Sequence, residues 1–126
     1  TDMIIFHGIE ITAFVRGYMH VGKIEGDAET LHIFNHIGEY DMTPDQVLER
    51  LVELEKMFPL DAVEITTKGF RDTVFESLNI PYPKIASDDS HTMVGVGRAW
   101  IELDAKRDKD SILRAVRQGS FWNCYV

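Results

Sequence analysis

The sequence predicts an α/β domain with a mainly parallel sheet, because segments of strand character alternate with segments of helical periodicity along the chain. The length of 126 residues and the 44% content of hydrophobic residues suffice for one domain with a substantial core. No internal repeat, low-complexity run or linker interrupts the sequence. We therefore expect a single domain over residues 1–126.

The first third of the chain carries apolar segments rich in β-branched and aromatic residues, which are typical of strands. These segments are residues 3–6, 9–15, 18–21 and 31–37. The dipeptide Arg16-Gly17 is a turn signal, so the segment after it is expected to return as a strand.

A long amphipathic helix is predicted to begin after Thr43. This residue is a preferred N-cap, Pro44 suits the first helical position, and Gln46 completes a capping box. Apolar residues then recur at helical spacing until Pro59 ends the helix. They are Val47, Leu48, Leu51, Leu54 and Met57.

The remaining elements continue the alternation of strands and helices. Strands are predicted over residues 61–66, 84–86 and 98–103. A shorter helix over residues 70–78 is expected to bury Phe70, Val74, Phe75 and Leu78. A last helix, capped by Asp110 or Ser111 and ended by Gly119, is expected to bury Ile112, Leu113 and Val116.

The charge balance indicates which partners suit the chain. Thirteen Lys and Arg residues against 21 Asp and Glu residues give a net charge of −8, which argues against nonspecific binding to a phosphate backbone. A small substrate or a protein partner fits better. Cys124 is the single cysteine, so no intrachain disulfide framework forms, and a reducing, cytoplasmic location is expected. The sequence shows no membrane-spanning run and no signal-peptide pattern at its start.

The segment that follows residues 84–86 is the first candidate for a functional site. Asp89 and His91 are two residues apart, and this spacing directs both side chains to one face at the end of a strand. A carboxylate and an imidazole held in this way suit a divalent metal. The same composition is also common in ordinary turns, so both interpretations stay open.

Three further residues lie on or just after apolar runs. They are Glu10, His20 and His36. Functional residues of parallel α/β sheets gather at the carboxyl ends of strands, so these residues and the Asp89/His91 pair make a plausible set of metal ligands. Each also has a simpler interpretation: Glu10 as a solvated carboxylate, and either histidine as an ordinary half-buried side chain. His32 shares a strand face with His36, but one of the two is expected to be structural.

Short motifs follow one another in an order that resembles the later metal motifs of the polymerase and histidinol phosphatase (PHP) superfamily. They are Gly8-Ile9-Glu10-Ile11-Thr12, His20-Val21, Asn35-His36 and Ser87-Asp88-Asp89-Ser90-His91. Residues 94–99 with the strand after them, and then residues 111–121, resemble the closing strand, helix and Gly-x-Phe ending of that superfamily. The resemblance covers nearly the whole chain.

The resemblance implies a distorted (β/α)7 barrel that binds between one and three Zn, Mn or Fe ions and hydrolyses phosphoesters. Glu10 would bridge two ions, His20 and His36 would complete one coordination shell, Asp89 would belong to a neighbouring ion and His91 to a further one. Metal-activated water would attack phosphorus in a small phosphomonoester or nucleotide-like substrate.

The sequence departs from this family pattern at its start, because no His-x-His strand precedes Glu10. The chain therefore resembles the C-terminal part of a PHP domain, a partial or shortened barrel with an open sheet edge. An upstream segment or a second copy would complete the fold, or the protein is a shortened member. Two functions follow: a metal-dependent phosphoesterase, or a degenerate PHP-like metal-binding or assembly module without turnover.

Overall fold

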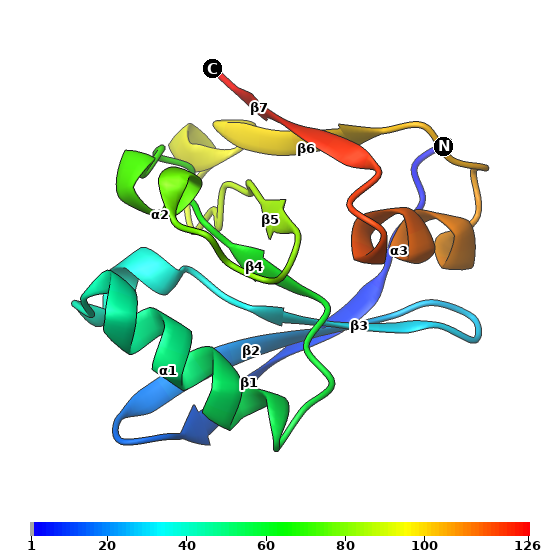
Figure 1. Cartoon of the computed structure of the whole chain (residues 1–126). Coiled ribbons are helices and arrows are strands. Elements are labelled where there is room, and N and C mark those ends of the chain that lie inside the picture. The colour runs from blue at the N-terminus through cyan, green and yellow to red at the C-terminus, as the bar shows by residue number, and fades with distance from the viewer. Residues whose placement is uncertain (1) are drawn as a thin grey trace.

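The computed structural model describes residues 2–126 (Figure 1). Thr1, the first residue of the predicted domain, lies outside the described residues. The main sheet has five strands in the order of the chain. They are β1 (His7–Phe14), β2 (Tyr18–Glu25), β3 (Thr30–Phe34), β4 (Ala62–Glu64) and β5 (Lys84–Ile85). A second sheet pairs β6 (Ala99–Leu103) with β7 (Phe121–Tyr125).

The predicted (β/α)7 barrel with mainly parallel strands is wrong. Residues 2–126 form no closed barrel, and the main sheet is mixed: β1, β2 and β3 are antiparallel neighbours, while β3, β4 and β5 are parallel. The reason lies in the connections, because a parallel crossover needs about a dozen residues or more. Only residues 15–17 join β1 to β2, and only residues 26–29 join β2 to β3, so both pairs must form hairpins.

The two parallel pairings follow from the two helical connections. α1 (Pro44–Glu55) links β3 to β4, and α2 (Thr73–Ser77) links β4 to β5. The cap predicted for α1 is confirmed: Gln46 N–H donates to Thr43 Oγ1 at 3.3 Å, and Thr43 N–H donates to Gln46 Oε1 at 2.9 Å. This capping box satisfies two backbone donors at the start of the helix.

Several local predictions are wrong in extent. Residues 3–6 form no strand, and α2 covers only part of residues 70–78. Phe75 is buried as expected, but Phe70 and Val74 are exposed, because so short a helix buries only one turn of its apolar face. Met57, beyond the end of α1, is also exposed.

The last helix, α3 (Lys109–Arg117), is capped by Asp108, two or three residues earlier than predicted. Asp108 Oδ1 accepts the Ser111 N–H at 2.8 Å. Asp110 instead accepts N–H bonds from Ala28 and Glu29, which tie α3 to the β2–β3 turn. Gly119 follows the helix with a φ of +71°, as expected of a residue that ends a helix, and β7 begins two residues later.

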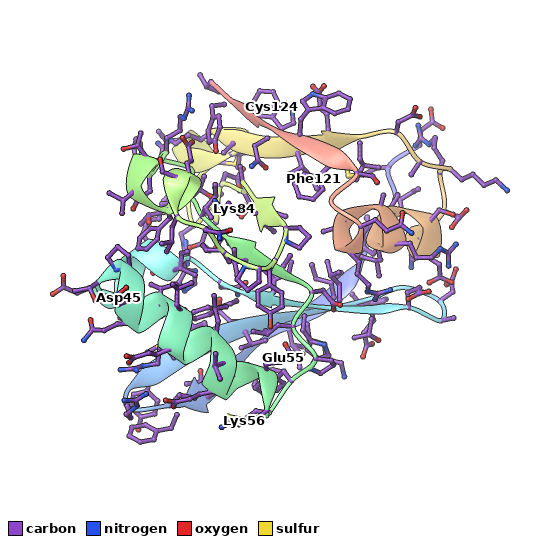
Figure 2. All side chains as sticks on the ribbon, in the orientation of Figure 1. Asp45, Glu55, Lys56, Lys84, Phe121 and Cys124 are labelled. Atoms are coloured by element: carbon purple, nitrogen blue, oxygen red, sulfur yellow. The ribbon has the colours of Figure 1, made fainter. Side chains whose placement is uncertain are left out.

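The main sheet is covered differently on its two faces (Figure 1). On one face Val47, Leu51 and Leu54 of α1 form the larger core with residues of, and just after, the central strands. These are Val21, Phe34, Ile37 and Val63. On the other face α3 and the β6–β7 ribbon cover Leu31, Ile33, Ala62 and Ile85. Phe121 of β7 packs against this second cluster (Figure 2). A hollow of about 350 Å³ on the second face is lined in part by Ile33 and Ile85.

Among residues 2–126, no helix combines the length and the apolar character needed to cross a bilayer.

The capping box at Thr43 is expected to stabilise the fold. Replacing Thr43→Ala removes the acceptor of the Gln46 N–H, so the free energy of unfolding should fall by about 1 kcal/mol in urea denaturation. Thr92→Ala is the matched control, because Thr92 precedes a short 3-10 turn without a side-chain cap bond and should change stability by less than about 0.5 kcal/mol. Equal losses in both variants would show that the capping box does not stabilise α1.

Candidate metal centre

Polar side chains gather where the parallel strands of the main sheet end. His36 follows β3, Glu64 ends β4, and Asp89 follows β5. The antiparallel strands β1 and β2 bring Glu10 and His20 to the same place, and Glu10 lies opposite Gly22 in the register of the hairpin. These residues line or adjoin the hollow of about 350 Å³ on the face that α3 and the β6–β7 ribbon partly cover.

Glu10, His20 and His36 form a group whose potential ligand atoms all lie within 4.8 Å of one another. His20 Nδ1 is 3.0 Å from His36 Nε2 and 3.4 Å from Glu10 Oε1. Two ligands of a tetrahedral zinc ion at about 2.0–2.1 Å are themselves roughly 3.3 Å apart, so the nitrogen spacing is close to that of a coordinated pair. The set of two nitrogens and one carboxylate oxygen fits Zn, Mn or Fe.

A second group shares His36 with the first. It consists of His36, Glu39 and Asp89, again with ligand atoms within 4.8 Å of one another. Glu39 Oε2 lies 3.6 Å from His36 Nε2, and Asp89 Oδ2 lies 3.6 Å from His36 Nδ1. A neutral imidazole has one nitrogen with a free lone pair, so the tautomer of His36 decides which of its nitrogens can bind a metal.

Asn35 fixes the carboxylate of Glu10. Its Nδ2 donates to Glu10 Oε2 at 2.9 Å, which leaves Oε1 on the side of His20. Gly22 makes this contact possible, because a Cβ at that position would lie only 2.9 Å from Asn35 Oδ1. The absence of a side chain on β2 therefore lets Asn35 reach across the strand to β1.

Tyr40 holds the backbone on both sides of the centre. Its hydroxyl donates to the Asn35 carbonyl at 2.7 Å and accepts the His20 N–H at 3.0 Å. Its ring stacks on Phe34 with the centroids 5.3 Å apart. Burial raises the pKa of Tyr40 above its ordinary value, so the hydroxyl keeps the proton that it donates.

His36 is the most enclosed of the candidate ligands, with 4% of its surface exposed. Burial by itself lowers the pKa of His36, but the hydrogen bond to Glu64 and the charges of Glu39, Glu64 and Asp89 outweigh burial and raise the pKa. Burial and the charge of Glu64 also raise the pKa of Asp89, against the opposing effect of His36. The centre therefore has an excess of negative charge that a bound cation would relieve.

The spacing of Asp89 and His91 predicts two side chains on one face at the end of a strand, and the structure differs from this. β5 ends at Ile85, and Asp89 lies in the following loop with a φ of +43°. His91 is exposed and its Nδ1 contacts the Asp89 carbonyl oxygen at 2.8 Å, outside both groups of the described residues. His32 also lies apart from them, with its ring 5.9 Å from that of Phe58. The metal role of Asp89 and His91 stays a prediction.

The sequence analysis missed Glu39, Tyr40 and Glu64. Glu64 is 5% exposed, and its Oε1 accepts the His36 N–H at 2.6 Å. One signal was available for it, because Glu64 stands between Val63 and Ile65 in an apolar run, just as Glu10 stands between two isoleucines. Glu39 and Tyr40 follow Gly38 in a 3-10 turn, and no pattern in the sequence marks them.

A family model described as PHP-associated matches residues 77–121. This segment runs from the end of α2 to the start of β7 and includes Asp89 and His91. The C-terminal region of the chain is therefore related to the PHP superfamily. The curated proteins include no match to the sequence.

Tyr40 provides a prediction about the rigidity of this centre. Tyr40→Phe leaves the Asn35 carbonyl and the His20 N–H without their hydroxyl partner, so the free energy of unfolding should fall by about 1–3 kcal/mol. Tyr82→Phe is the matched control, because within residues 2–126 the Tyr82 hydroxyl bonds to the exposed carboxylate of Glu55 and to no backbone group. Its cost in the same urea titration should stay below about 1 kcal/mol. Indistinguishable losses would contradict the bridging role of Tyr40.

Proposed function

We propose that this chain forms part of a metal-dependent phosphoesterase that hydrolyses a phosphomonoester or nucleotide-like substrate. The observation that carries the proposal is the convergence of Glu10, His20 and His36, from three separate segments, on one point at the end of the sheet. The PHP-related region at residues 77–121 supports the same class of function.

In this proposal Glu10, His20 and His36 hold a Zn, Mn or Fe ion. Asp89 would contribute to a neighbouring ion, with Glu10 as the bridge, and His91 to a further one. A divalent ion bound there would supply a Lewis acid that activates water and neutralises negative charge on the phosphoryl oxygens. Every other contribution comes from the protein, which must bind the substrate and orient it.

Two hollows meet at the centre and suit a small phosphorylated molecule. The hollow of about 350 Å³ joins the polar residues to the apolar side chains of Ile24, Ile33 and Ile85. A second hollow of about 280 Å³ lies beyond Asp89 and includes Lys68 and Arg98. In the proposed reaction the side chains of Lys68 and Arg98 attract the phosphate group, and the apolar part of the first hollow receives the rest of the substrate.

The alternative is a PHP-like metal-binding or assembly module without turnover. One observation favours this alternative: β1 is an edge strand of the described sheet, with β2 on one side and no described strand on the other. Ile9 and Phe14 on this edge strand are 63% and 68% exposed. A strand from a second copy or from an upstream segment would cover such an edge.

The decisive experiment combines native mass spectrometry with an assay of turnover. The chain is incubated with Zn or Mn, its bound metal and subunit number are read from the spectrum, and p-nitrophenyl phosphate and nucleoside monophosphates are then offered. Bound metal with turnover supports the phosphoesterase. Bound metal without turnover supports the metal-binding module. A metal-free dimer overturns the phosphoesterase and supports an assembly module, and a metal-free monomer overturns both functions.

Glu10→Gln tests the assignment of the ligands. The amide is a poor metal ligand, so bound metal and any phosphatase activity should fall together, each by at least about tenfold. Glu25→Gln is the matched control, because the Glu25 side chain lies exposed on β2 and pairs with Lys23, with 3.2 Å between Glu25 Oε1 and Lys23 Nζ. It should keep both properties. Unchanged metal content in Glu10→Gln would remove Glu10 from the centre.

A further inference from the structure

We infer that Glu64 is a positioning residue which, together with Ser87, turns one particular nitrogen of His36 toward the candidate metal centre. The inference rests on the proposed function in so far as the centre binds metal. The family resemblance includes Ser87 in a motif but assigns no role to Ser87 or to Glu64.

Glu64 lies buried at the end of β4, and its carboxylate contacts His36 and Ser87. Its Oε1 accepts the His36 backbone N–H at 2.6 Å and lies 3.4 Å from His36 Nδ1. Its Oε2 accepts the Ser87 hydroxyl. A carboxylate is costly to bury, and among residues 2–126 Glu64 forms an ion pair with His36 but with no lysine or arginine. Its place beside an imidazole therefore indicates a role there.

Ser87 and Thr66 hold Glu64 in a fixed orientation. The Ser87 N–H donates to Thr66 Oγ1 at 3.0 Å, and the Thr66 hydroxyl donates to the Ser87 carbonyl at 2.7 Å. Thr66 is fully buried. This reciprocal pair joins the chain beyond β4 to the chain beyond β5, so the Ser87 hydroxyl that binds Glu64 is positioned by the sheet itself.

His36 needs such support, because its backbone lies in the left-handed region. Its φ and ψ are 35° and 59°, a conformation that costs about 1–3 kcal/mol for a residue other than glycine. The short bond from its N–H to Glu64 helps to hold this conformation. The backbone of His36 is thus fixed by the same carboxylate that faces its ring.

The ring of His36 has distinct surroundings at its two nitrogens. Nδ1 faces Glu64 at 3.4 Å and Asp89 at 3.6 Å, while Nε2 lies 3.0 Å from His20 Nδ1. A carboxylate beside Nδ1 favours the tautomer with its proton on that nitrogen. The lone pair of Nε2 then points to His20 and Glu10, where the proposed centre would use it.

Glu64→Gln tests this role, since glutamine has the same shape and still accepts the His36 N–H. Cobalt(II) is the probe, and its dissociation constant should rise by about 10- to 100-fold. In the metal-free protein, at a pH where the imidazole is neutral, nitrogen-15 NMR should show His36 shifting from the Nδ1–H toward the Nε2–H tautomer. A purely structural role would leave the tautomer unchanged.

Glu55→Gln is the matched control. Glu55 accepts bonds from the Leu60 N–H at 2.9 Å and the Tyr82 hydroxyl at 2.8 Å, away from the centre. It should alter neither cobalt affinity nor the His36 tautomer. Ser87→Ala, with Ser77→Ala on α2 as its control, weakens the hold on Glu64 more gently. It should move both readouts in the same direction as Glu64→Gln by a smaller amount, and it serves if Glu64→Gln fails to fold.

The outcomes separate this inference from the proposed function. If the wild-type chain binds no cobalt, the proposed function fails, and the tautomer in the metal-free variants still decides the role of Glu64. If the tautomer of His36 is the same in wild type and variants, the positioning role is overturned even where cobalt binding weakens. A shift of the tautomer in Glu64→Gln and Ser87→Ala, with neither control affected, supports it.

Discussion

The hydrogen bond from the His36 N–H to the buried Glu64 joins the ends of β3 and β4, and the arrangement of the centre depends on it. It holds His36 in a left-handed conformation just after its strand, and from there the imidazole meets His20 of the antiparallel hairpin. Tyr40, one turn further along, can then reach back to the backbone of both β2 and β3. A single buried carboxylate therefore links the parallel half of the sheet to its antiparallel half.

The carboxylate of Glu64 also adds to the negative charge around His36, which favours a positive charge at this place. Glu39, Glu64 and Asp89 surround one largely buried imidazole, and they raise the pKa of His36 although burial alone lowers it. A proton on His36 is one way to offset this charge, and a metal ion is another, so the two compete for the same nitrogen. The negative surroundings favour any cation, and the choice between a proton and a metal rests on the neighbours of each ring nitrogen.

Local signals predicted some elements well, whereas long-range pairing had to come from the structure. The capping box of α1 depends on four consecutive residues, Thr43 to Gln46, so the sequence alone predicted it and the structure confirms it. The loops after β1 and β2 were short enough to exclude parallel crossovers, yet the alternation of elements favoured them, and the barrel was predicted wrongly. Glu10, His20 and His36 stood out by type and position, and they lie together. Glu64 has apolar neighbours in the sequence as Glu10 does, but its contacts could not be predicted, because its partners are 28 and 23 residues away.

The residues of the candidate metal centre differ in how firmly the surrounding structure holds them. His36 is enclosed by two strands and three carboxylates, but the side chain of Glu10 is 46% exposed on an edge strand. Its position is fixed by Asn35, by the nearby ring of His20 and by the pairing of β1 with β2. Whatever covers the free side of β1 would therefore act on Glu10 more than on any other member of the group. In the proposed phosphoesterase, the pairing of that edge would help to hold Glu10 in one geometry, which catalysis requires and simple metal binding does not.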